Sequence, residues 1–141
     1  MKKKNGFTLV ELLAVIVILA IIIAIAVPAS IAISNRIKKN MFCKKIAMIE
    51  QSATLYGQDN FNTVLGKGSS GLNVKVQDLV LNGYLKKDVK EANVGEGAVV
   101  NPMDGSSIDN YRIKLIVNNS VSKNRIKATC IENKCNNLCG E

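Results

Sequence analysis

The chain has 141 residues, a formal net charge of +8 and 48% hydrophobic residues, and this length suits a single domain. It contains no histidine, which excludes imidazole-based catalytic triads and HExxH zinc sites. No carboxylate pair, nucleophile–base pair or metal cluster stands out in residues 58–141, so we expect neither an enzyme nor a cofactor.

A long apolar segment at residues 7–33 dominates the first part of the chain. Residues 12–27 carry only Leu, Ala, Val and Ile side chains. Because a helix rises about 1.5 Å per residue, the segment is long enough to cross a hydrocarbon core of about 30 Å. Three lysines at positions 2–4 favour a cytoplasmic N-terminus, and so a single-pass protein of the cytoplasmic membrane. The alternative is an ordinary signal peptide, for which Ala-Ile-Ala at 24–26 offers a weak cleavage site.

One charged residue, Glu11, lies near the start of this apolar segment. An ionised carboxylate at the edge of a membrane span is costly and is usually paired or functional. A plain membrane anchor gives no reason for such a residue. The sequence therefore predicts a partner for Glu11.

The residues around Glu11 form a recognisable motif. The stretch from Gly6 onward reads Gly-Phe-Thr-Leu-Val-Glu-Leu-Leu, follows a basic leader at residues 1–6 and precedes an apolar helix that contains Pro28. This pattern resembles the prepilin peptidase recognition sequence of type IV prepilins and pseudopilins. The resemblance implies cleavage between Gly6 and Phe7 and N-methylation of the Phe7 amine. It also implies that helix 7–33 is kept, first as a membrane anchor and later as a filament core.

The spacing of Phe7 and Glu11 suits this interpretation. The two residues lie one helical turn apart, and the freed Phe7 amine is a cation in apolar surroundings. In a filament, Glu11 of one subunit is expected to neutralise the Phe7 amine of a neighbour. Such a pair fixes the axial register more than it adds net stability, because burying two charges is itself costly. Thr8 is expected either to form a local hydrogen bond to a backbone carbonyl or to have a functional role, and the sequence leaves both alternatives open.

Pro28 interrupts the apolar helix in its second half. Proline lacks an N–H group and clashes with the preceding turn, so we expect a kink or a local opening of the helix there. The kink either marks the membrane boundary or belongs to a segment that rearranges in the filament. The sequence leaves these two alternatives open.

Residues 34–57 continue the helix in amphipathic form. One apolar stripe is expected to pack under a globular head, and it holds Phe42, Ile46, Ile49, Ala53 and Tyr56. A second stripe lies on another side of the helix and holds Ile37, Met41, Met48 and Leu55. The two stripes predict either a helix that touches its own head and its neighbours, or one broad core face. Gly57 is the expected end of the helix.

The same helix carries a cluster of five positive charges at Arg36, Lys38, Lys39, Lys44 and Lys45. Three interpretations compete for this cluster. It lies on an anionic membrane surface, it holds DNA phosphates without sequence preference, or it forms an ordinary solvated face. Residues 58–141 carry eleven basic and nine acidic side chains, so strong nucleic-acid binding by the head is not expected.

The remaining residues, 58–141, predict a small head. We expect a loop over residues 57–73, a short helix at 74–81 ending at Asn82-Gly83, a brief strand at 98–101 and a turn at 102–105. Alternating patterns predict strands at 111–117 and 125–131, joined through residues 118–124 as a hairpin. The expected fold is α+β, with a long N-terminal helix packed on a small antiparallel sheet of two or three strands, as in type IV pilins.

Four cysteines are expected to form two disulfides in an exported head: Cys43, Cys130, Cys135 and Cys139. The pairing is open, although Cys43 must join the C-terminal segment if all four are bonded. Type IV pilins often carry a C-terminal disulfide loop, so the resemblance also favours bonds. A zinc site with four cysteine ligands is the alternative.

The expected function is that of a structural subunit of a type IV pilus-like filament on the bacterial surface. Its partners would be copies of itself or other pilins, prepilin peptidase, the assembly machinery and the cytoplasmic membrane, with DNA as a weaker candidate. A pseudopilin of a secretion or DNA-uptake apparatus, or a minor pilin, is the first alternative. A membrane-anchored binding domain that never polymerises is the second.

Overall fold

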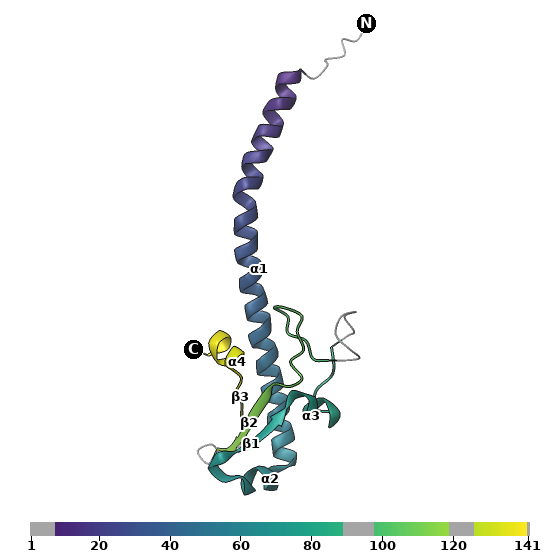
Figure 1. Cartoon of the computed structure of the whole chain (residues 1–141), viewed down its shortest axis with the longest axis vertical. Helices are drawn as coiled ribbons and strands as arrows, with labels where there is room; N and C mark the ends of the chain where they lie inside the picture. Colours follow the sequence, from purple (N-terminus) through teal and green to yellow (C-terminus); the bar gives the residue numbers. More distant parts are fainter. Residues whose placement is uncertain (1–7, 89–97, 119–125, 141) are drawn as a thin grey trace. The chain divides into compact units, whose positions relative to one another are not determined.

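The computed structural model describes residues 8–88, 98–118 and 126–140. The chain divides into two compact units, residues 1–37 and 38–141. One helix, α1 (Leu9–Asp59), contributes residues to both (Figure 1). The leader, residues 1–6, and Phe7 lie outside the described residues.

The N-terminal unit consists of the first part of α1. Its apolar side chains have no partner within this unit, because every described side chain from Thr8 to Ile37 is exposed. The helix continues without a break through residues 27–29, whose side chains are not described. The kink expected at Pro28 therefore stays a prediction. By length and composition, with a mean hydropathy of 3.3, α1 contains one segment that can cross a membrane.

The second unit adds short elements to the rest of α1. They are helix α2 (Phe61–Gly66), the 3₁₀ helix η1 (Gly68–Ser70), strand β1 (Leu72–Lys75), helix α3 (Val76–Leu81), strand β2 (Arg112–Val117), strand β3 (Ile126–Cys130) and helix α4 (Asn133–Cys139). The predicted loop at 57–73 is wrong, because α2 and η1 occupy most of it. The helix predicted to begin at residue 74 begins at Val76, and the residues before it form β1. Helix α4 was not predicted.

The three strands form one antiparallel sheet in the order β1-β2-β3 (Figure 1). Leu72 pairs with Leu115 across β1 and β2, and Ile113 pairs with Cys130 across β2 and β3. The predicted β2–β3 pairing is confirmed, while most of its connection, residues 119–125, lies outside the described residues. The strand predicted at 98–101 is reduced to a single bridge between Val100 and Ser107. The predicted α+β architecture of the pilin kind is confirmed.

The core of the second unit lies between α1 and one face of the sheet. Of the predicted stripe on α1, Tyr56 is half-buried and the other four residues are buried. They belong to one cluster with inward-facing sheet residues, namely Val74, Ile113, Leu115 and Ile126. Tyr56 also packs edge-on against Tyr84, with ring centroids 5.3 Å apart. This stripe is therefore confirmed as the core face of the helix.

Gly57 is not the end of α1, which continues to Asp59. The glycine is buried where the helix passes closest to the sheet. A Cβ atom at this position would lie 2.8 Å from Cγ2 of Ile126 and 3.3 Å from Cδ1 of Leu115. The small residue permits a close approach of helix to sheet, which is a tertiary requirement rather than a helix stop signal.

Candidate functional site

The start of α1 is a reciprocal capping box formed by Thr8 and Glu11. The Thr8 backbone N–H and the Thr8 hydroxyl both donate to Oε2 of Glu11, each at 3.0 Å. In return, the Glu11 N–H donates to the Thr8 hydroxyl oxygen at 3.4 Å. Thr8 thus occupies the N-cap position before Leu9, and Glu11 occupies the third helical position, where a carboxylate also favours the positive end of the helix dipole.

This geometry corrects one expectation for Thr8. Its hydroxyl donates to a carboxylate and not to a backbone carbonyl. The sequence signal was available, because threonine followed three residues later by glutamate before an apolar run is the capping-box pattern. Gly6 and Phe7, the two residues expected at the processing site, lie outside the described residues.

The apolar segment that follows is exposed along its described length. Leucine and isoleucine side chains such as Leu12, Ile18 and Ile22 are 56–60% exposed. Near its second half, the Ser30 hydroxyl donates to the carbonyl of Ala26 at 3.0 Å. This local bond satisfies a polar side chain that would otherwise face an apolar medium.

The predicted basic cluster divides into two parts. Arg36, Lys38, Lys39 and Lys44 are exposed. Lys45, by contrast, is half-buried, forms an ion pair with Asp88 and donates to the carbonyl of Val100 at 2.6 Å. Lys45 therefore ties α1 to the segment around residue 100 and does not belong to a free cationic surface. No local sequence pattern predicts this contact, because Asp88 lies 43 residues away.

The second apolar stripe on α1 is exposed. Ile37, Met41, Met48 and Leu55 are 51–56% exposed, so they do not join the core of the second unit. Of the two interpretations of this stripe, the single broad core face is wrong. The helix has one buried apolar face and one exposed apolar face.

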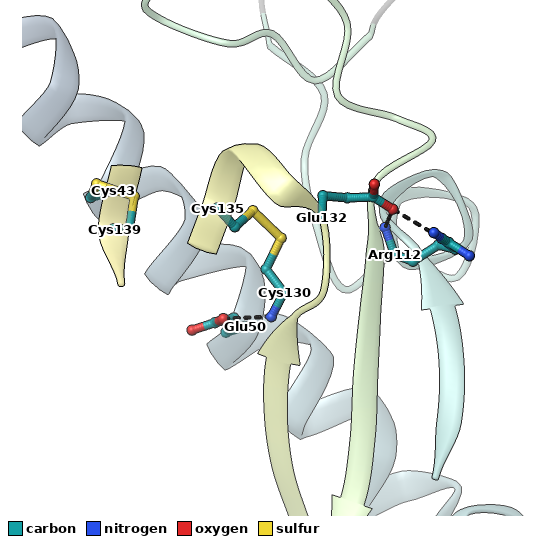
Figure 2. The surroundings of a disulfide bond; sticks show 7 residues. All are labelled: Cys43, Glu50, Arg112, Cys130, Glu132, Cys135 and Cys139. Atoms are coloured by element: carbon teal, nitrogen blue, oxygen red, sulfur yellow. Dashed lines mark hydrogen bonds and ion pairs between the residues drawn. A yellow bond between two sulfur atoms is a disulfide. The ribbon is translucent and has the colours of Figure 1, made fainter. Parts of the chain in front are cut away.

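The four cysteines form two disulfides that fasten the C-terminal residues (Figure 2). Cys43 of α1 is bonded to Cys139, and Cys130 at the end of β3 is bonded to Cys135 in α4. Because all four sulfur atoms are bonded, the alternative zinc site with four cysteine ligands is wrong. Glu50 of α1 supports the same region, since its Oε1 accepts a 2.7 Å hydrogen bond from the N–H of Cys130.

An open cavity of about 480 Å³ lies in the second unit, and its lining includes Lys38, Lys45, Asp88 and Asp104. The Lys45 ammonium in it is already neutralised by Asp88. Asp104 accepts hydrogen bonds from Ser106 and Lys134, and these bonds hold the pKa of its carboxyl well below the usual range. Lys45, Asp88 and Asp104 are therefore engaged in contacts within the chain.

Comparison with known proteins places a family motif on the first part of the chain. Residues 1–27 match the prokaryotic N-terminal methylation motif. Curated proteins and solved structures gave no match. The motif indicates a type IV pilin-like protein that is processed as a prepilin, and it implies a structural protein. The chain thus carries the prepilin-type cleavage and methylation signature, on an α+β architecture of the pilin kind.

Proposed function

We propose that the chain is a structural subunit of a type IV pilus-like surface filament, assembled through the first part of α1. The observation that carries this proposal is the exposed apolar segment directly after the capped Glu11. Its side chains have no partner in their own unit, so lipid or other subunits must cover them. The methylation motif at residues 1–27 identifies the processing route that leads to such a helix.

The chemistry at Glu11 supports assembly by charge pairing. Oε2 accepts the bonds from Thr8, while Oε1 makes no hydrogen bond to any residue that the structure describes. One carboxylate oxygen thus remains for the methylated Phe7 amine of a neighbouring subunit. Lipid tails are as apolar as the helix itself, so packing and such polar pairs must decide how subunits associate. The pair would select one axial register among many.

The first test is the intact mass of the native protein. A mature chain that begins at methylated Phe7 is expected. A chain that keeps residues 1–6 would favour the membrane-anchored domain that never polymerises. A chain cut after Ala26 would remove Glu11 and contradict the proposal.

A matched pair of variants separates the two roles of Glu11. Glu11→Gln keeps an oxygen that accepts the Thr8 bonds but removes the charge. Thr8→Ala keeps the charge but removes the hydroxyl, at a cost to the helix of about 1 kcal/mol. We expect processed Glu11→Gln subunits to lose filament formation and Thr8→Ala subunits to retain it, measured by electron microscopy of sheared cell-surface material. Normal filaments from Glu11→Gln would contradict charge pairing.

A pseudopilin of a secretion or DNA-uptake apparatus, or a minor pilin, is the second candidate. The exposed cations of α1 at Arg36, Lys38, Lys39 and Lys44 favour the DNA-uptake version, because clustered cations bind phosphates without sequence preference. Quantitative mass spectrometry of purified filaments distinguishes the candidates. A major subunit dominates the filament mass, whereas a minor pilin is a small fraction and a pseudopilin remains with the cell envelope.

A further inference from the structure

The nearly balanced charge of residues 58–141 conceals an uneven distribution. The described carboxylates of this region are all engaged inside the chain. Asp59 accepts from Tyr84, Asp78 from the Lys75 N–H, Asp88 from Lys45, Asp104 from Lys134, Asp109 from the Val99 N–H and Glu132 from Arg112. Three of these carboxylates, those of Asp88, Asp104 and Glu132, are in ion pairs with cations of the same chain.

The sheet collects three lysines on the face that points away from the core. Val74, Ile113 and Ile126 are buried, and the alternation along each strand turns their neighbours outward. The outward neighbours include one lysine from each strand, Lys75 of β1, Lys114 of β2 and Lys127 of β3; Lys75 and Lys127 are exposed and Lys114 is half-buried. We call these three residues the sheet lysines.

The strand register fixes how the sheet lysines are spaced. Lys75 lies opposite Arg112, Lys114 opposite Asn73 and Thr129, and Lys127 opposite Ile116. Lys75 and Lys127 are therefore four residues apart along the strands and two strands apart across the sheet. Standard strand geometry makes this about 14 Å by about 10 Å. The cations follow a diagonal line instead of converging on one point.

The charges of the sheet lysines are not neutralised by the rest of the described chain. None of the three ammonium groups forms a hydrogen bond or ion pair with a described residue. Arg112, on the same face, is already paired with Glu132 at 2.9 Å (Figure 2). The Asp78 carboxylate reaches the backbone of Lys75. Three cations thus remain available to an external anion.

We propose that the sheet lysines bind the phosphate backbone of duplex DNA without reading its sequence. A duplex carries one charge per about 1.7 Å of its axis, so a diagonal of this length lies against several phosphates at once. The outward residues of the three strands include no aromatic side chain, so the face lacks the stacking platform that single strands use. A second copy of the chain is a poorer partner, because the described carboxylates of its residues 58–141 already accept hydrogen bonds within their own chain. This proposal does not depend on filament formation.

The test uses the full-length protein in non-ionic detergent and a short fluorescent duplex of mixed sequence. Anisotropy titrations over a series of salt concentrations should give a slope of log K against log salt of about −2.7, from three phosphate contacts at −0.9 each. The triple variant Lys75→Gln/Lys114→Gln/Lys127→Gln should flatten this slope. Its affinity should fall on the order of 100-fold at about 0.15 M salt.

The control is the triple variant Lys67→Gln/Lys86→Gln/Lys87→Gln, which removes the same charge from exposed positions outside the sheet and outside α1. It should keep the slope and the affinity within a few-fold of the unsubstituted chain. Equal losses in both triple variants would show a response to net charge and overturn the proposal. Full binding by the sheet variant would also overturn it. Near-UV circular dichroism of the tyrosines establishes that the sheet variant is folded.

Two further ligands test other partners for the same face, namely single-stranded DNA and a lipid surface. A single strand of the same sequence should bind more weakly than the duplex, and tighter binding would contradict backbone recognition of a duplex. Vesicles of phosphatidylglycerol and phosphatidylcholine test a membrane surface. If the sheet variant loses binding to these vesicles but keeps binding to the duplex, the partner is a lipid surface and the proposal is wrong.

Discussion

The two parts of α1 both carry many apolar residues, but these side chains are exposed in one part and include a buried stripe in the other. In the N-terminal unit the described leucine and isoleucine side chains are exposed. In the second unit, Phe42, Ile46, Ile49 and Ala53 of the same helix are buried within the chain. The sequence around the first part has no polar face, whereas the second part alternates apolar stripes with lysines.

This difference concerns what covers the apolar side chains of each part. The second part folds against a sheet that the chain itself supplies, so its stability is an internal property. The first part has no such surface in its own unit, and burial must come from lipid or from other subunits. Changes to one part should therefore alter head stability, while changes to the other should alter insertion or assembly.

The largest effect on head stability is expected from removing the Cys43–Cys139 bond. It joins residues 96 positions apart, whereas Cys130–Cys135 spans five. A disulfide lowers the entropy of the unfolded chain, and it does so more when it closes a longer loop. Cys43→Ala/Cys139→Ala should therefore lower the free energy of unfolding by about 4–5 kcal/mol, and Cys130→Ala/Cys135→Ala by about 2 kcal/mol. Urea unfolding of the detergent-solubilised protein, followed by tyrosine near-UV circular dichroism, measures both. Equal losses would indicate that the loop length is not the deciding factor.

Two neighbouring residues of α1 sharpen the contrast between its faces. Ile49 is fully buried, and Ile49→Ala should lower the free energy of unfolding of the head by about 3 kcal/mol through a lost contact area and a cavity. Met48 is 51% exposed, and Met48→Ala should change it by less than about 0.5 kcal/mol. The same unfolding assay applies. A filament yield that falls for Met48→Ala while the head stays stable would assign the exposed stripe to contacts between subunits.

A smaller effect is expected where α1 passes over the sheet. Gly57→Ala places a Cβ atom 2.8 Å from Ile126, and the overpacking should exceed the gain in helix propensity, for a net loss of about 1–2 kcal/mol. Gly66→Ala is the matched control, because its added Cβ meets no described atom within 4 Å apart from its chain neighbours and the backbone of its own helix. Urea unfolding midpoints compare the two variants. A stabilised Gly57→Ala would mean that the sheet can shift to accept the methyl group.

The smallest effect is a pH dependence that arises from Asp104. Its hydrogen bonds from Ser106 and Lys134 lower the pKa of the folded-state carboxyl below its unfolded value. The resulting stability is therefore present at neutral pH and is lost as the pH falls below about 4, towards the folded-state value. Solvent screens the exposed pair, so the effect is modest. Asp104→Asn should reduce the difference between urea midpoints at pH 7 and pH 3, and Lys134→Gln should do so in part.

The periodic segments of the head were predictable because their patterns are long enough to be read locally. The stripe on α1 and the alternation in β2 and β3 each specify one buried face, and the structure bears this out. The loop predicted at 57–73 was wrong because the glycines and asparagines of this segment are typical of loops, although the segment forms α2, η1 and the start of β1. Contacts with β2 determine the backbone conformation of this segment. At Gly71, for example, a Cβ atom would lie 2.6 Å from the Leu115 carbonyl oxygen.

The sequence by itself determined the processing signature, the apolar segment and the α+β class, since these depend on composition, spacing and periodicity within short stretches. Only the tertiary structure decided which cysteines pair, that Lys45 is held by Asp88, and that Lys75, Lys114 and Lys127 share one face. Those features join residues that are distant along the chain. Their proximity depends on strand register and on how closely α1 approaches the sheet, and no local pattern encodes either quantity.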